Sequence, residues 1–393
     1  MKGNKYPVII AVQNKHHQAE ISNCCAEYGV VFCTYDKVFP ILVQTRETEI
    51  LKNISGFKDK KPNEALKMTK YIGIDIPVTR CNLRCSYCYL GQMDYLEQAA
   101  GENIVYEPQF LRHVLRKEKV GGSALVGLCG DGETLLSRNF EKTCAEILKE
   151  GHYIHIVTNG LLADKIKAII FECGEYARNI IFKISFHYSE LKKLNLLDQF
   201  ANNVKMISDS EASYTIELMP HDEIIDDIPD IIDYSIKNFG ALPQLTIGRQ
   251  HFNGGKLLTN MSEEEYKKVW GVFDSEMFDM RMELYQRHGQ NCLAGARSCF
   301  IDLSTGNVKR CVYEEQMGNI CIDDQNLNLD PVGDACPLNY CFNCHVYGSM
   351  GVVGNMDTSC TYMTIRDRKR ADGSHWLKDN MREYLDIKLS DVD

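Results

Sequence analysis

From residue 71 onward the chain alternates short apolar runs with longer amphipathic stretches. The apolar runs have the length and composition of buried strands, and they cover residues 71–79, 124–130, 153–159, 179–186, 213–219 and 244–250. The amphipathic stretches predict helices near residues 107–118, 138–150, 161–172, 189–207, 224–238 and 262–287. Near-continuous apolar strands joined by helices predict a parallel sheet with right-handed crossovers.

The first 67 residues follow a different pattern. Val8–Val12 and Val30–Thr34 are predicted strands on either side of a helix near residues 17–28, and Phe39–Gln44 is predicted to be a third strand. The segment Lys52–Asn63 combines many charges with Gly and Pro, which is typical of a linker. We therefore expect a small α/β extension over residues 1–67.

Composition narrows the possible functions. A chain of 393 residues exceeds one ordinary domain, so two or three units are expected. The net charge of −10 argues against nucleic-acid binding and against docking on anionic membranes. No apolar run approaches the roughly 20 residues of a spanning helix, and the N-terminus lacks a signal-peptide pattern. We expect a cytoplasmic protein with neither nucleic acid nor membrane as a partner.

The 17 cysteines include three closely spaced thiols, Cys81, Cys85 and Cys88, directly after the predicted strand 71–79. An odd count without an export signal argues against a disulfide framework. The spacing C-x3-C-x2-C can hold three irons of a four-iron cluster and leave the fourth iron without a protein ligand. A structural zinc site instead has four protein ligands. A zinc site or inert thiols are the alternative interpretation.

The run Thr79-Arg-Cys-Asn-Leu-Arg-Cys-Ser-Tyr-Cys-Tyr89 resembles the signature of radical S-adenosylmethionine (radical SAM) enzymes. The resemblance implies a partial (β/α)6 barrel, an open relative of the eight-fold barrel, over residues 68–289. It implies a [4Fe–4S] cluster that binds S-adenosylmethionine at the C-terminal ends of the strands. Reductive cleavage would give a 5′-deoxyadenosyl radical that removes hydrogen from an unactivated C–H bond. A flavodoxin-like or ferredoxin-like protein would supply the electron.

The resemblance also implies residues that bind S-adenosylmethionine. The segment Gly130-Asp-Gly-Glu-Thr134 is similar to the Gly-Gly-Glu-Pro loop that binds the methionine amino group, with Asp and Thr replacing the second glycine and the proline. The implied cofactor-binding residues are Tyr87 by the adenine, Gly132, Glu133, Thr158, Asn159, and Ser185 at the ribose or carboxylate.

Two of these assignments have structural alternatives. Thr158 and Asn159 can instead form an ordinary helix N-cap and turn. His187 follows the fourth predicted strand and is a candidate acid or base for the substrate, because the pKa of a histidine can fall near neutrality. The alternative for His187 is a structural histidine with satisfied hydrogen bonds.

A second group of cysteines follows the last predicted helix. Ser304-Thr-Gly-Asn307 predicts a hairpin turn that places Cys292 and Cys311 at opposite ends of a two-stranded unit. The later cysteines are Cys336, Cys341 and Cys344. Residues 290–393 resemble the SPASM/twitch modules of the radical SAM family, which implies one auxiliary [4Fe–4S] cluster held by Cys292, Cys311, Cys341 and either Cys344 or Cys336. A zinc ribbon has a similar pattern and is the alternative.

Relatives with SPASM/twitch modules modify ribosomal peptides or oxidise small polyols and sugars, so the resemblance implies a peptide or carbohydrate-type substrate. For residues 1–67, packing against the rest of the chain is favoured over binding a leader peptide. The competing function is a non-catalytic zinc or iron–sulfur interaction protein on the same fold.

Overall fold

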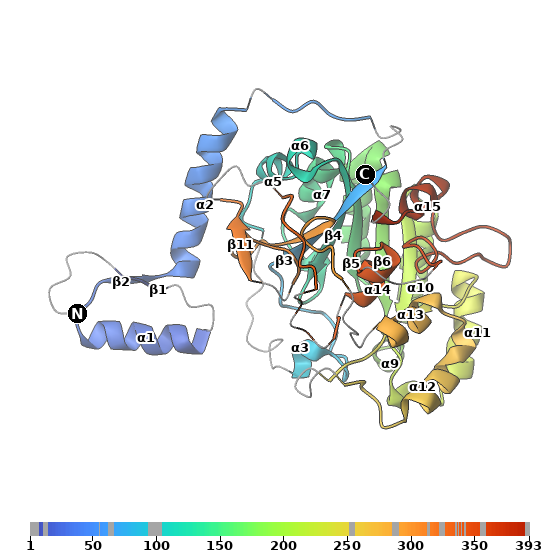
Figure 1. The fold of residues 1–393 in the computed structure, drawn as a ribbon. Helices are drawn as coiled ribbons and strands as arrows, with labels where there is room; N and C mark the ends of the chain where they lie inside the picture. The colour runs from blue at the N-terminus through green and yellow to red at the C-terminus, as the bar shows by residue number, and fades with distance from the viewer. Residues whose placement is uncertain are drawn as a thin grey trace.

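A computed structural model describes residues 8–10, 15–54, 56–61, 67–92, 104–250, 256–284, 291–312, 315–321, 327–334, 336, 338, 340–341, 343–353 and 359–389. Within these residues one large sheet has the strand order β11-β10-β9-β3-β4-β5-β6-β7-β8 (Figure 1). Its parallel part comprises β3 (Met68–Ile76), β4 (Ser123–Gly130), β5 (Tyr153–Thr158), β6 (Ile180–Phe186), β7 (Ser213–Leu218) and β8 (Gln244–Leu245).

Strands β3 to β8 pair in chain order, and every neighbouring pair is parallel. Sequential parallel pairing is the order of α/β barrels, so the predicted parallel α/β fold is confirmed. Strand β8 spans only two residues of the predicted run 244–250.

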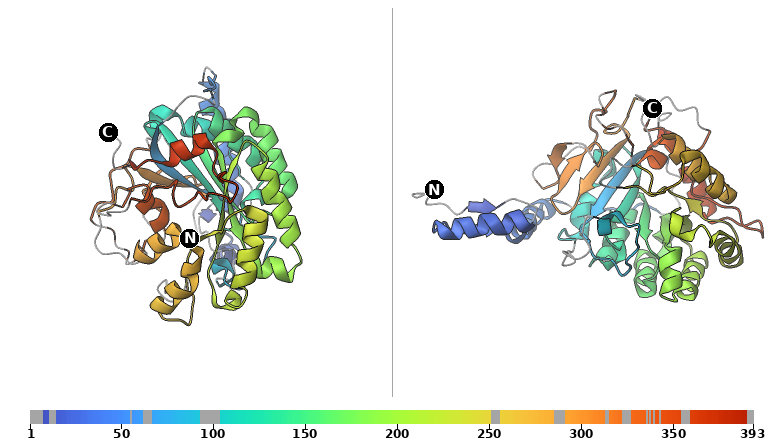
Figure 2. Two further views of the ribbon diagram at one scale, coloured as in Figure 1. Left: turned by 90° about the vertical axis from the view of Figure 1, so that its right-hand side faces the viewer. Right: turned by 90° about the horizontal axis from the view of Figure 1, so that it is seen from below.

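Helices cover one face of this sheet and form a layer along its outer side (Figure 2). They are α5 (Pro108–Val114), α6 (Lys117–Val120), α7 (Phe140–Lys149), α8 (Ala163–Cys173), α9 (Tyr188–Lys193), α10 (Leu197–Ser208) and α11 (Ile228–Phe239). Short 3-10 turns occupy Thr134–Leu136, Gly174–Asn179, Asp222–Ile224 and Gly271–Phe273.

The two faces of the sheet pack against different parts of the chain, because successive side chains of a strand point to opposite faces. Ile72, Val126 and Phe182 belong to the core shared with the helices. Tyr71 and Leu125, each one position earlier, belong to a second core with the C-terminal region. That region includes α14 (Cys344–Ser349) and α15 (Asp379–Leu385). We call the face of the sheet that packs against the C-terminal region the inner face. It is covered partly by residues that come late in the sequence.

The predicted hairpin extends the sheet. Strand β9 (Ser298–Asp302) pairs antiparallel with β10 (Asn307–Lys309), and β10 pairs antiparallel with β11 (Gln316–Asn319). Strand β9 also pairs parallel with β3, with Asp75 opposite Asp302. Before the hairpin come α12 (Glu263–Trp270) and α13 (Glu276–Leu284). The sequence predicted the hairpin, but not its pairing with β3.

The N-terminal region contains β1 (Val8–Ile10), α1 (Lys15–Glu27), β2 (Phe32–Thr34) and α2 (Tyr35–Lys52), with β1 parallel to β2. The predicted strand Phe39–Gln44 is wrong, because these residues lie inside α2. The side chains that α2 buries recur every fourth residue, as on one helix face: Phe39, Val43 and Glu47. Helix α1 and the β1–β2 pair project away from the large sheet (Figure 1).

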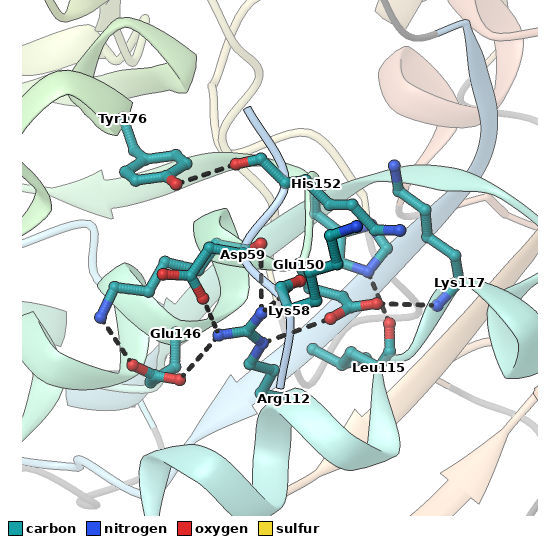
Figure 3. A network of polar contacts seen from close by, with 11 residues as sticks. Lys58, Asp59, Arg112, Leu115, Lys117, Glu146, Glu150, His152 and Tyr176 are labelled. Carbon is teal, nitrogen blue, oxygen red and sulfur yellow. Dashed lines mark hydrogen bonds and ion pairs between the residues drawn. The ribbon is translucent and has the colours of Figure 1, made fainter. Parts of the chain in front are cut away.

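Arg112 of α5 ties residues 56–61 to the helix layer (Figure 3). Its buried guanidinium contacts the carboxylates of Asp59 at 2.8 Å, Glu146 at 3.3 Å and Glu150 at 3.2 Å. It also donates to the carbonyl oxygen of Lys58 at 3.2 Å. This part of the predicted linker is thus held against α5 and α7. No helix among the described residues combines the length and apolarity needed to cross a membrane.

His152 gives the fold a pH dependence. The fully buried ring accepts from the Ala124 N–H at 3.0 Å. Its Nε2 lies 2.6 Å from the Leu115 carbonyl oxygen (Figure 3). Burial lowers the pKa of His152 from 6.5 to about 4, and the charge of Lys117 adds to this. Because the folded pKa is below the unfolded one, the unfolded chain binds the proton more readily. The contribution of neutral His152 to the free energy of unfolding is therefore fully present above pH 6.5 and is lost as the pH falls toward 4.

We expect the free energy of unfolding of the wild-type protein to fall by about 2 kcal/mol more than that of His152→Gln between pH 7 and pH 5. Anaerobic denaturant titrations at both pH values measure this difference. Equal losses in the two proteins would show that His152 does not cause the dependence.

Candidate functional site

The cysteine loop lies at the C-terminal end of β3. Cys81, Cys85 and Cys88 are half-buried and lie between β3 and the short helix α3 (Tyr89–Gln92). The Cys88 N–H donates to the Cys85 carbonyl oxygen at 3.1 Å, which closes a turn between these two cysteines. The strand ends where the sequence predicted the functional edge of the sheet.

The surroundings of Cys81 suit a metal-bound thiolate. Its sulfur accepts from the Leu83 N–H at 3.4 Å and from the Asn159 side-chain amide at 3.8 Å. Hydrogen bonds to cysteine sulfur are one way in which proteins tune iron–sulfur clusters. Burial raises the pKa of Cys85 to about 12, and a bound metal deprotonates such a thiol. The donor set therefore fits a cluster with three cysteine ligands.

The loop after β4 is locked onto the cysteine loop by backbone hydrogen bonds. The Gly132 N–H donates to the Val78 carbonyl oxygen at 2.6 Å, and the Glu133 N–H donates to the Arg80 carbonyl oxygen at 2.8 Å. A Cβ atom on residue 132 would lie 2.0 Å from that Arg80 oxygen. Only glycine allows the two loops to approach this closely.

Glu133 joins the end of β4 to the end of β5. Its side chain is buried and accepts from the Thr158 hydroxyl at 2.6 Å, from the Asn159 N–H at 2.7 Å and from the Leu135 N–H at 3.2 Å. Burial raises the pKa of Glu133, and these three donors oppose the shift. Three residues predicted separately, Glu133, Thr158 and Asn159, thus form one hydrogen-bonded unit.

Thr158 and Asn159 also make the turn hydrogen bonds that their structural alternative predicts. The Thr158 hydroxyl accepts from the Gly160 N–H at 3.1 Å, and the Asn159 side-chain oxygen accepts from the Leu161 N–H at 3.1 Å. The Asn159 amide nitrogen contacts the Asn82 side-chain oxygen at 2.6 Å. Asn82 was missed by the sequence analysis, although it lies inside the cysteine motif.

Tyr87, inside the cysteine loop, contacts two histidines, His187 and His221. The Tyr87 hydroxyl is 2.7 Å from His187 Nδ1, and the ring centroids of Tyr87 and His221 are 4.4 Å apart. Burial, followed by the neighbouring His221, lowers the pKa of His187 to about 4. The structure thus favours a neutral, hydrogen-bonded His187 over a group that titrates near neutrality. Ser185 is half-buried on β6, opposite Glu217 of β7.

The C-terminal cysteines gather around one apolar cluster on the inner face of the sheet. Cys292 and Cys344 are buried members of this cluster, and Cys311, Cys336 and Cys341 pack against it. Cys311 follows β10 at the open end of the hairpin, whereas Cys292 precedes β9 and forms β-bridges with Gly333 and Val353. Among the described residues, no three His, Cys, Asp or Glu side chains are close enough to hold a single metal ion.

The sequence analysis also missed the charged groups on the inner face, such as Lys183 of β6 and Glu217 of β7. A signal was present, because each is a charged residue inside an otherwise apolar strand. Their partner Arg366 could not be found in this way, since it lies 149 residues from Glu217 in the sequence.

Residues 76–233 match the family profile of the Radical SAM superfamily. These residues form a radical SAM domain. Radical SAM proteins bind a [4Fe–4S] cluster and S-adenosylmethionine, so the predicted resemblance and these two cofactors are confirmed for the matched segment. The auxiliary cluster stays a prediction. The matched segment contains the cysteine loop, the loop after β4 and His187.

Several solved structures are similar to this chain at low identity. Streptococcus suis SuiB bound to precursor peptide SuiA is 15% identical, with a TM-score of 0.44 over 73% of this chain and 76% of that chain. Native anSMEcpe with bound AdoMet and Cp18Cys peptide is 14% identical, with a TM-score of 0.46 over 65% and 79%. BtrN in complex with AdoMet and 2-DOIA is 16% identical, with a TM-score of 0.32 over 65% and 79%.

Proposed function

We propose that this protein is a radical SAM enzyme that modifies an unactivated C–H bond of a peptide or carbohydrate-type substrate. The observation that carries the proposal is the docking of the three-thiol loop onto the Gly130–Glu133 loop. Two backbone hydrogen bonds hold these loops together inside the matched domain. They bring the loop with the three thiols beside a backbone turn that leaves no room for a side chain at residue 132.

Each cysteine of the loop has the same proposed role. Cys81, Cys85 and Cys88 hold three irons, and the Asn159 amide and Leu83 N–H stabilise the Cys81 thiolate. When bound, the cluster supplies the electron that cleaves S-adenosylmethionine to methionine and a 5′-deoxyadenosyl radical. The protein's own task is to orient the reactants and to exclude water.

The proposed S-adenosylmethionine contacts follow the functional edge of the sheet. Gly132 lets the backbone reach the methionine amino group, while Glu133 mainly holds the ends of β4 and β5 in register through its three hydrogen bonds. Ser185 is proposed at the ribose or carboxylate, and Tyr87 beside the adenine. His187 is proposed to position the Tyr87 ring through their 2.7 Å hydrogen bond.

We further propose one auxiliary [4Fe–4S] cluster in the C-terminal region. Its ligands would be Cys292, Cys311 and Cys341, with Cys344 or Cys336 as the fourth. Their packing around one apolar cluster supports this set. The proposed units remain residues 1–67, 68–289 and 290–393, and a flavodoxin-like or ferredoxin-like protein is the proposed electron donor.

The test is uncoupled cleavage of S-adenosylmethionine. Protein purified and reconstituted anaerobically, then reduced with dithionite, should form 5′-deoxyadenosine and contain about eight irons per chain without zinc. Oxidised protein is the control and should form none. Absence of 5′-deoxyadenosine would support the non-catalytic alternative, and zinc with about four irons would support a zinc ribbon in place of the auxiliary cluster.

A further inference from the structure

The inner face of the sheet changes character along the strands. Near their N-terminal ends it carries Tyr71, Leu125 and Ile181, which pack against the C-terminal region. Two positions after Ile181 comes Lys183, and Glu217 lies near the end of the neighbouring strand β7. Side chains two apart in a strand share a face. On the inner face, the charged residues Lys183 and Glu217 therefore lie closer to the C-terminal strand ends, and so to the cysteine loop, than the apolar residues do.

Two cations from different parts of the chain pair with the carboxylate of Glu217, and a third lies nearby. Lys183 Nζ lies 3.4 Å from a Glu217 carboxylate oxygen, and Arg366 forms a second ion pair with the same oxygen. Arg281 of α13 contacts His345 Nδ1 at 3.1 Å. The Lys183 side chain is 15% exposed, that of Glu217 7% and that of Arg366 0%. We call Lys183, Thr215, Glu217, Arg281 and Arg366 the inner-face cluster.

The inner-face cluster has more positive than negative charge. Lys183 and Arg366 pair with the carboxylate of Glu217, and the positive charge of Arg281 also acts on it. Burial alone would raise the pKa of that carboxyl group, but the attraction of Arg366, Lys183 and Arg281 outweighs burial and holds the pKa below its usual value. A buried surplus of charge is costly unless an opposite charge compensates it.

Within the part of the chain that the structure describes, several hydrogen-bond donors of the cluster have no acceptor. The unpartnered buried atoms are Arg281 Nε, Arg366 Nε and NH2, and the Thr215 hydroxyl oxygen. Buried polar groups normally find partners, and guanidinium groups match carboxylates and phosphates in geometry as well as in charge. The unpartnered donors and the surplus positive charge both favour binding of an anion at this cluster.

We propose that the inner-face cluster is a subsite that binds an anionic group of the substrate, either a carboxylate or a phosphate. The inference rests on the proposed function. Arg281 and Arg366 lie outside the matched segment 76–233, and Arg281 contacts His345, which follows Cys344 in the sequence. The favoured substrates are thus peptides with an acidic residue or terminal carboxylate, and acidic or phosphorylated sugars, rather than neutral polyols.

The experiment measures binding of succinate and of inorganic phosphate to the cluster-loaded protein by anaerobic calorimetry, with S-adenosylmethionine saturating. We expect saturable binding of at least one anion. Lys183→Met should weaken it about tenfold or more, since a charge-assisted contact is lost. Glu217→Gln should tighten it, because it removes the competing carboxylate. Lys205→Met is the control and should bind like the wild type, because the Lys205–Asp209 pair is exposed on α10.

Opposite shifts in Lys183→Met and Glu217→Gln would support the subsite, since misfolding cannot tighten binding. The preferred anion then assigns the subsite to a carboxylate or a phosphate. The proposal is overturned if neither anion binds, if Lys183→Met binds like the wild type, or if binding occurs only without clusters or without S-adenosylmethionine. Formation of 5′-deoxyadenosine by the same wild-type sample shows separately whether the proposed function holds.

Discussion

Cys85→Ala is expected to abolish formation of 5′-deoxyadenosine and to lower the iron content by about four per chain. Two thiolates, Cys81 and Cys88, would remain on a loop that needs three to hold a cluster with one open iron. The auxiliary cluster should remain, because its proposed ligands come from other elements. Anaerobic reconstitution followed by iron analysis and product chromatography measures both effects.

Cys24→Ala is the matched control for this variant. Cys24 is an exposed cysteine of α1, far along the chain from the cysteine loop. It should retain full iron content and cleavage. Undiminished cleavage by Cys85→Ala would show that the cysteine loop does not hold the reactive cluster.

Gly132→Ala should reduce cleavage of S-adenosylmethionine about a hundredfold, because displacement of a reacting group by about 1 Å can cost that much. The added Cβ would lie 2.0 Å from the Arg80 carbonyl oxygen, so the cysteine loop must shift relative to β4. The measurement is the initial rate of 5′-deoxyadenosine formation in protein with its clusters loaded.

The control for Gly132→Ala is Gly271→Ala. A Cβ at residue 271 meets no atom within 4 Å, and its backbone φ of −59° is ordinary for alanine. That variant should cleave at the wild-type rate. Equal rates in both variants would mean that close approach of the two loops is not needed for activity.

The strands of the parallel sheet could be predicted because their apolar runs are continuous and bounded by turns. The run Phe39–Gln44 misled the prediction, since a short apolar run has no periodicity of its own. Only the wider spacing of Phe39, Val43 and Glu47 indicates the helix face that α2 buries. Strand β8 is shorter than predicted because only Gln244 and Leu245 pair with β7.

The candidate site could be predicted in part, because its cysteines and the Gly130–Glu133 loop are local motifs. The hydrogen bonds of Glu133 could not be predicted, since they depend on how the ends of β4 and β5 align in space. The same holds for the pairing of Arg366 with Glu217, which joins residues 149 positions apart in the sequence. Local sequence fixes ligand spacing, whereas tertiary packing decides which carboxylate is engaged by its neighbours.

The pairing of β9 with β3 has a mechanical consequence. Strand β3 leads directly to the cysteine loop and pairs along Tyr71–Asp75 with β9, the first strand of the hairpin. A rigid-body movement of the hairpin away from the sheet would break the β3–β9 hydrogen bonds and destabilise the strand that precedes the cysteine loop. In the proposed enzyme, substrate entry and product release are therefore expected to leave the β3–β9 pairing intact.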